Sequence, residues 1–100
     1  MKHTVTIVFC EGCRWALRSG WYAQELLSTF QGQLGGVLLQ PGEQGQFQVW
    51  VGEQLIWCRK RDGGFPDAAD LKRRVRDIAA EGQSLGHCDL PQADEGASAS

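Results

Sequence analysis

The sequence predicts an α/β fold, in which a mixed four-stranded sheet and two helices form a two-layer sandwich with the order β-α-β-β-β-α. Three observations lead to this prediction. A short apolar run near the N-terminus precedes a segment with helical periodicity, several short apolar runs follow between glycine-rich turns, and a basic amphipathic segment comes last. One hundred residues are enough for one hydrophobic core, so we expect a single domain.

The first strand is expected over residues 4–9. Val5, Ile7 and Phe9 share one face of this strand, and Val8 adds an apolar side chain to the other face. Nearly continuous apolar character is typical of a strand that is covered on both faces. We therefore expect both faces of this strand to be covered.

The first helix is expected over residues 13–30, because apolar residues recur there along one side at helical spacing. Gly32 is a typical residue to end it. Leu17 and Trp21 break the pattern, since both fall on the polar side. They form a partner surface if they are exposed, or are covered by another segment of the chain.

Three further strands are expected over residues 34–39, 46–51 and 54–58. The second of these alternates apolar and polar residues, as a half-buried strand does. Gly52-Glu53 fits a two-residue hairpin turn with glycine first, so the last two strands should be antiparallel.

A basic, glycine-rich loop is expected over residues 59–66, and Asp67 should cap a last helix, with Asp70 three residues later as in a capping box. From residue 91 onward the sequence is small, polar and acidic. The expected organisation is therefore one domain over residues 1–90 and a disordered tail over residues 91–100.

The element order brings distant loops together. A strand, a helix and a strand form a parallel pair through a right-handed crossover. Both parallel strands then end at the same edge of the sheet, which places Cys10 beside the Pro41–Gly45 loop. The following hairpin returns the Arg59–Pro66 loop to that edge. This arrangement resembles a smaller version of the thioredoxin fold.

The four cysteines are Cys10, Cys13, Cys58 and Cys88. The N-terminus lacks the pattern of a secretory signal, and no stretch approaches the length of a membrane span, so we expect a cytoplasmic protein. In a reducing compartment, a Cys-x-x-Cys pair indicates a redox-active or metal-binding site. We read Cys58 as a small buried residue or an auxiliary thiol.

The Cys10-Glu11-Gly12-Cys13 motif suits thiol–disulfide exchange. The helix N-terminus, with help from Arg14 and Arg18, should favour a thiolate. We expect Cys10 to be exposed and to act as the attacking thiolate. Cys13, expected inside the first helical turn, would act as the resolving thiol.

Longer motifs extend this interpretation. They are Phe9–Trp15, Trp21–Phe30, Arg61–Asp67, Leu71-Lys72, Val75–Ile78 and Leu85–Asp89. Together they resemble bacterial, cysteine-containing members of the selenoprotein W-like family (SelT/SelW/SelH, Rdx), over about residues 4–89. The resemblance implies a thioredoxin-like fold and a redox function linked to glutathione or protein thiols. In selenocysteine-containing relatives the position matching Cys13 carries selenocysteine, so the resemblance makes Cys13 a second candidate for the nucleophile.

We expect no bound cofactor, with glutathione as a possible co-substrate. The predicted catalytic residues are Cys10 and Cys13, and the predicted substrate-binding or partner-binding residues are Arg14, Arg18, Trp21, Arg61, Gly64 and Phe65. The basic run around Arg61 recognises an anionic thiol in one interpretation and is a solvated loop in the other.

Two other functions remain open from the sequence. One is a redox-sensitive adaptor without turnover. The other is a zinc protein with Cys10, Cys13, His87 and Cys88 as ligands. The net charge of −2 and the absence of aromatic residues from the basic helix face argue against nucleic-acid binding. The oligomeric state is left open.

Overall fold

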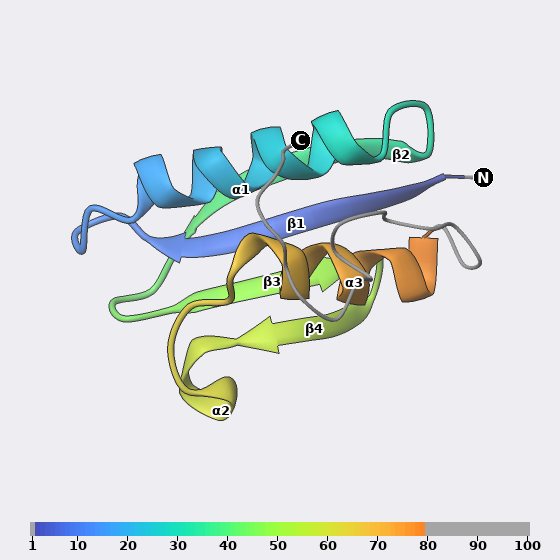
Figure 1. Ribbon diagram of the computed structural model, residues 1–100. Coiled ribbons are helices and arrows are strands. Elements are labelled where there is room, and N and C mark those ends of the chain that lie inside the picture. The colour runs from blue at the N-terminus through green and yellow to red at the C-terminus, as the bar shows by residue number, and fades with distance from the viewer. Residues whose placement is uncertain (1, 80–100) are drawn as a thin grey trace.

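A computed structural model describes residues 2–79 of the protein (Figure 1). The elements are β1 (His3–Cys10), α1 (Ala16–Thr29), β2 (Leu34–Gly42), β3 (Phe47–Val51), β4 (Gln54–Cys58), α2 (Arg59–Asp62) and α3 (Ala68–Ala79). Apart from the short helix α2, this is the predicted order. The predicted domain boundary at residue 90, the tail over 91–100, and His87 and Cys88 lie outside the described residues.

The four strands form one mixed sheet in the order β2-β1-β3-β4. β1 and β2 run parallel, and Cys10 stands opposite Gly42 in their register. β1 pairs with β3 in antiparallel fashion, as β3 does with β4, where Gln48 stands opposite Cys58. The α/β fold with a mixed four-stranded sheet is therefore confirmed. β1, β2 and β4 all end at the same edge, as the element order predicted.

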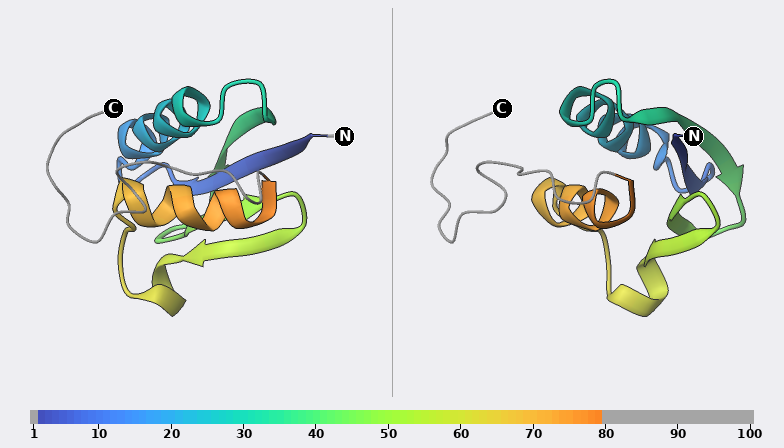
Figure 2. Two further views of the ribbon diagram at one scale, coloured as in Figure 1. Left: turned by 45° about the vertical axis from the view of Figure 1, so that its right-hand side comes forward. Right: turned by 90° about the vertical axis from the view of Figure 1, so that its right-hand side faces the viewer.

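The two long helices lie on the same face of the sheet. α1 packs against β1 and β2, and α3 packs against β3 and β4, and Figure 2 shows both on one side. Within residues 2–79, no helix packs on the opposite face, so this part of the chain does not supply the expected cover for the second face of β1. Val8 is nevertheless only 7% exposed, because neighbouring side chains on the open face enclose it.

The core lies between the sheet and the two helices. Its fully buried members include Val5, Ile7 and Phe47 from the sheet, Tyr22, Leu26 and Phe30 from α1 and its end, and Leu71 and Val75 from α3. Each large apolar side chain buried in this way contributes roughly 1.5–3 kcal/mol. The core therefore joins α1 and α3 to the sheet.

The structure corrects the start of the first helix. It begins at Ala16 rather than at residue 13, because residues 11–14 form a turn. The backbone N–H of Arg14 donates to the carbonyl of Glu11 at 3.0 Å, and Arg14 has a left-handed backbone with φ 64°. A residue in that region cannot continue a right-handed helix, so Cys13 lies in the turn and not in the first helical turn.

Two other boundaries differ from prediction. Residues 59–62 form α2 where a loop was expected: the Asp62 carboxylate accepts the Cys58 N–H at 2.9 Å, and Gly63, with φ 80°, ends the turn. β2 extends to Gly42 because its pairing with β1 continues that far. The predicted cap of the last helix is confirmed, since Asp67 Oδ1 accepts the Asp70 N–H at 2.8 Å.

Within residues 2–79, no helix combines the length and apolar character needed to cross a membrane.

Candidate functional site

Cys10 and Cys13 form a disulfide at the edge of the sheet where β1 ends. Their Cα atoms are 5.3 Å apart, which is within the ordinary range for a disulfide. Cys10 is the last residue of β1, and Cys13 lies in the turn that leads to α1. The backbone N–H of Cys13 also points at the Cys10 sulfur, with the nitrogen 3.2 Å from Sγ. The redox-motif geometry expected from the sequence is therefore present.

The accessibility of the two sulfurs is the reverse of the expectation. Cys10 is only 2% exposed, because it still belongs to β1, with β2 paired alongside it. Cys13 is more exposed, since the turn carries it away from the sheet. The prediction that Cys10 is the exposed cysteine is wrong, and its assignment as the attacking thiolate loses its basis.

An aromatic cluster packs against the segment that follows the motif turn, and two of its three rings come from residues distant in the sequence. Trp15, the residue before α1, packs edge-on against Phe65 with ring centroids 4.9 Å apart. Phe65 in turn packs against the buried Phe47, also at 4.9 Å. Sequence reasoning assigned Phe65 to substrate binding but did not include Trp15. The structure places Phe65 as a support for the segment that follows Cys13.

Two arginines lie over this aromatic cluster. The Arg18 guanidinium is 4.3 Å from the centroid of the Phe65 ring, and the Arg59 guanidinium is 5.1 Å from that of Trp15. Both distances are typical of cation–π contacts. Arg18 was predicted as a substrate residue and lies close to the motif, but its charge is engaged with Phe65. Arg14 is exposed and directly follows Cys13.

A hollow of about 340 Å³ adjoins the disulfide. Its lining comes from the motif on one side and from the end of β2 and the β2–β3 loop on the other: Cys10, Glu11, Gly12, Cys13, Gly42 and Gln44. Gly42 and Gln44 were missing from the predicted site residues. The parallel strand pair was the available signal, because it predicted that the Pro41–Gly45 loop lies beside Cys10.

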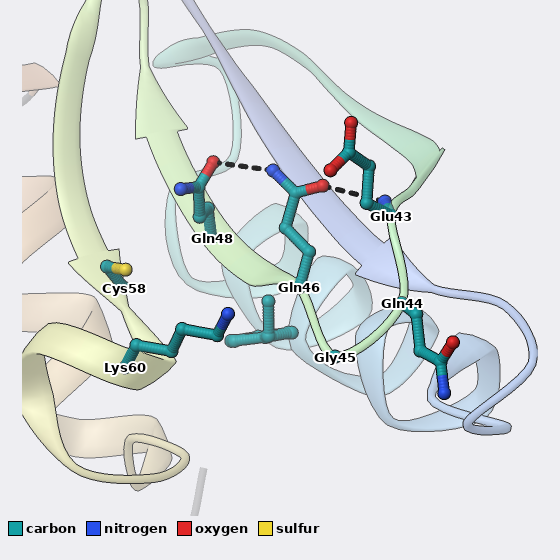
Figure 3. A pocket seen from close by; sticks show the side chains of 8 residues that line it. Glu43, Gln44, Gly45, Gln46, Gln48, Cys58 and Lys60 are labelled. Atoms are coloured by element: carbon teal, nitrogen blue, oxygen red, sulfur yellow. Dashed lines mark hydrogen bonds between the residues drawn. The ribbon is translucent and has the colours of Figure 1, made fainter.

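Gly42 is required by close packing. A Cβ at this position would lie 2.5 Å from Val8 Cγ1 and even closer to Gln46 Oε1. That oxygen accepts the Glu43 N–H at 2.8 Å, and Gln46 Nε2 donates to Gln48 Oε1 at 3.0 Å. Figure 3 shows this chain of hydrogen bonds along the loop. The glutamine side chains therefore hold the wall that faces the disulfide.

A second cavity, of about 200 Å³, lies on the far side of the same loop. Cys58 and Lys60 line it together with Gln46 and Gln48 (Figure 3). The pKa of the Cys58 thiol is lowered, chiefly because the backbone N–H of Arg61 hydrogen-bonds to the sulfur. Cys58 is half-buried and free, so the expectation of a small buried residue is not met, and the auxiliary-thiol interpretation stays a prediction.

The remaining predicted partner residues are spread over the surface. Arg61 pairs with the adjacent Asp62 at 2.8 Å, and the Gly64 carbonyl accepts the Trp57 indole N–H at 2.9 Å. Trp21 is 48% exposed on α1. The fold brings Phe65 and Arg18 close to the motif, whereas Arg61 and Gly64 make contacts of their own.

The zinc hypothesis depends on residues that the structure does not describe. Among residues 2–79, no group of three or more histidine, cysteine or acidic side chains is arranged to hold a metal ion. His87 and Cys88, the other two proposed ligands, lie beyond residue 79.

Comparison with known proteins shows which family the chain resembles in both sequence and structure. Residues 4–77 match the Rdx family. The crystal structure of a selenoprotein W-related protein from Vibrio cholerae is 44% identical, with a TM-score of 0.77, and the match covers 79% of this chain and 99% of that one. A Bordetella parapertussis protein of known structure is 48% identical, with a TM-score of 0.76, and the match covers 77% and 98% of the two chains.

No curated protein matches the sequence. The family match nevertheless spans most of the chain and includes both cysteines of the motif. The chain therefore belongs to the Rdx family of selenoprotein W-like proteins.

Proposed function

We propose that this protein is a thiol–disulfide oxidoreductase that exchanges its Cys10–Cys13 disulfide with protein thiols or glutathione. The observation that carries the proposal is the pair of sulfurs at the sheet edge, one accessible and one buried, beside an open hollow. Membership of the Rdx family supports a redox role.

The reaction proceeds in two exchange steps. A substrate thiolate attacks Cys13 Sγ, the Cys10–Cys13 bond breaks, and Cys10 leaves as a thiolate. A second substrate thiolate then attacks the substrate sulfur of the mixed disulfide, which releases the substrate disulfide and the Cys13 thiolate. Two substrate thiols are oxidised to one disulfide while the protein disulfide is reduced to two thiols. In the reverse direction, Cys13 attacks a substrate disulfide and Cys10 resolves it.

The geometry supports Cys13 as the sulfur that meets the substrate. Attack requires an approach along the S–S axis, and Cys10, at 2% exposed, offers little access. The Cys13 N–H, 3.2 Å from Cys10 Sγ, stabilises negative charge on Cys10 as it departs. A stabilised thiolate is the better leaving group. These roles are the opposite of those expected from the motif alone, and they agree with the family resemblance, which made Cys13 a second candidate for the nucleophile.

Single serine variants test both the function and the roles. Cys10→Ser keeps the accessible thiol and, when it is mixed with a substrate disulfide in the absence of excess free thiol, should trap a mixed disulfide on Cys13, because the internal resolving thiol is missing. Cys13→Ser keeps only the buried thiol and should form such adducts at least about tenfold more slowly. Adducts are counted by mass spectrometry on the peptide that carries the motif, with Cys58→Ser as the matched control. If both motif variants keep full turnover, the proposal is wrong. Faster trapping by Cys13→Ser would restore Cys10 as the attacking thiolate.

The exposed apolar residues of α1 favour a second candidate function, a redox-sensitive adaptor. Leu17 is 88% exposed and Trp21 is 48% exposed, and their spacing places them on one side of the helix. Arg14 and Arg18 lie near them in sequence. An adaptor would bind its partner protein with different affinities in its oxidised and reduced states. Its exchange activity would be negligible, both in the parent protein and in the serine variants.

A further inference from the structure

We propose that the exchange site selects neutral or cationic polypeptide thiols over glutathione, and that Glu11 is the residue that sets this preference. This inference rests on the proposed exchange function and deepens it by naming the substrate class. Glutathione carries two carboxylates and one ammonium group, so it approaches the disulfide as an anion. A cysteine within a polypeptide carries no such charge of its own.

The lining of the hollow is the first argument. Among the described residues that border it, Glu11 is the only one with a charged side chain. Gln44 contributes a neutral amide from the opposite wall, and in Figure 3 its side chain points away from Gln46 and Gln48. An incoming thiol therefore meets one carboxylate, neutral polar groups and glycine backbone. A carboxylate on the substrate adds like-charge repulsion without a compensating cation in the lining.

The second argument is the position of the nearby arginines, which an anionic substrate would need. Arg18 lies over the Phe65 ring, and Arg59 over the Trp15 ring. Arg61 forms an ion pair with Asp62. An anionic substrate that recruited these guanidinium groups would have to break contacts which already occupy them.

Within residues 2–79, Arg14 and Lys60 are the remaining cationic side chains near this edge. Arg14 follows Cys13 but is not among the residues that line the hollow. Lys60 lines the other cavity (Figure 3) and is likewise absent from the lining of the hollow. Neither residue belongs to the described lining of the hollow, whereas Glu11 does. The one charged residue in the described lining of the hollow is therefore negative.

The test compares thiols that differ in charge. Glutathione and three blocked peptides, identical except for Lys, Gln or Glu beside a single cysteine, reduce the oxidised protein under pseudo-first-order conditions. Samples are quenched with an alkylating agent, and reduction is read by mass spectrometry on the peptide containing Cys10 and Cys13. Rates are corrected for the thiolate fraction of each reagent, and divided by the rate of the Gln peptide with the same variant. Effects common to all thiols then cancel.

Charge variants at the two walls should move the rates in opposite directions. Glu11→Gln should raise the relative rates of glutathione and the Glu peptide about threefold, and lower that of the Lys peptide by a similar factor. Gln44→Glu should do the reverse. Both effects should nearly vanish in 1 M salt, where the screening length is about 3 Å. Glu53→Gln, in the turn at the far edge of the sheet, is the matched control and should leave the relative rates unchanged.

The outcomes separate this inference from the proposed function. If the Gln peptide fails to reduce the motif, the exchange function itself is wrong. If it reduces the motif but glutathione is equally fast and indifferent to Glu11→Gln, exchange stands and the charge preference is refuted. A threefold gain for glutathione that survives in 1 M salt would also refute it, because the cause would then not be electrostatic.

Discussion

Replacing Gly42 with alanine would place a methyl group between β2, Val8 and the glutamine side chains of the β2–β3 loop. The new Cβ would lie 2.5 Å from Val8 Cγ1 and 3.1 Å from Gln46 Cδ. Separations below about 3.0 Å are not tolerated, so the neighbours must shift. Val8 is 7% exposed in the central strand β1 and has little room to move. Gln46 is flexible, but its movement would disrupt its hydrogen bonds to the Glu43 N–H and to Gln48.

The expected cost follows from these contacts. Overpacking of this kind typically destabilises a protein by about 1–3 kcal/mol. For a domain of this size, 2 kcal/mol corresponds to a fall in melting temperature of about 10 °C. We expect this fall in the oxidised protein, measured by thermal unfolding with circular dichroism. The exchange rate of the Cys10–Cys13 pair should change as well, because Gly42 also borders the hollow beside the disulfide.

Gly20 offers a matched control. It lies in the interior of α1, and a Cβ there would meet no atom within 4 Å. Gly20→Ala should therefore stabilise the protein by about 0.5–1 kcal/mol, because alanine restricts the unfolded chain and favours the helix. A melting temperature of Gly42→Ala at or above that of the parent protein would show that residue 42 has room for a Cβ. The close packing of Gly42 against Val8 and Gln46 would then be refuted.

Two further predictions concern buried charge and thiol ionisation. Lys72 reaches across from α3 to Glu25 of α1 at 2.9 Å, with its side chain 7% exposed, so Glu25→Gln should cost about 1–3 kcal/mol by leaving a buried ammonium without its partner. Lys72→Met should lower the free energy of unfolding by less than about 1 kcal/mol, because it removes the buried charge itself. Urea unfolding at pH 7 measures both variants. A larger loss for Lys72→Met than for Glu25→Gln would contradict this prediction. The lowered pKa of Cys58 means that more of it is thiolate at neutral pH than in an ordinary cysteine. Its alkylation should therefore reach half of its maximal rate at a lower pH in the folded protein than in urea, as followed by mass spectrometry, and coincident profiles would show that the backbone N–H of Arg61 does not stabilise the thiolate.

Local patterns were sufficient to predict most of the fold. Period-two and helical patterns located the strands and the two long helices, and the order of elements predicted the parallel β1–β2 pair. That pair in turn predicted that the loop after β2 lies beside Cys10, which the hollow confirms. These predictions succeed because side-chain periodicity and strand direction depend only on neighbours in the chain and on the handedness of the crossover.

Tertiary structure decided what the local patterns do not contain. The burial of Cys10 depends on how far β2 pairs along β1, and the late start of α1 depends on the left-handed backbone at Arg14. Both long helices pack on one face of the sheet, so within residues 2–79 no helix covers the other face, and the periodicity of β1 does not show this.

The electrostatic environment of the site likewise depends on non-local packing more than on the local sequence. The sequence placed several cations near the motif, but contacts with residues distant in the chain engage Arg18 with Phe65 and Arg59 with Trp15. By itself, then, the sequence determined the family, the sheet and the Cys10–Cys13 pair. Which sulfur is accessible, and which charge lies beside it, were decided only when non-local packing assigned each side chain its neighbours, because burial and electrostatic environment are properties of the folded chain.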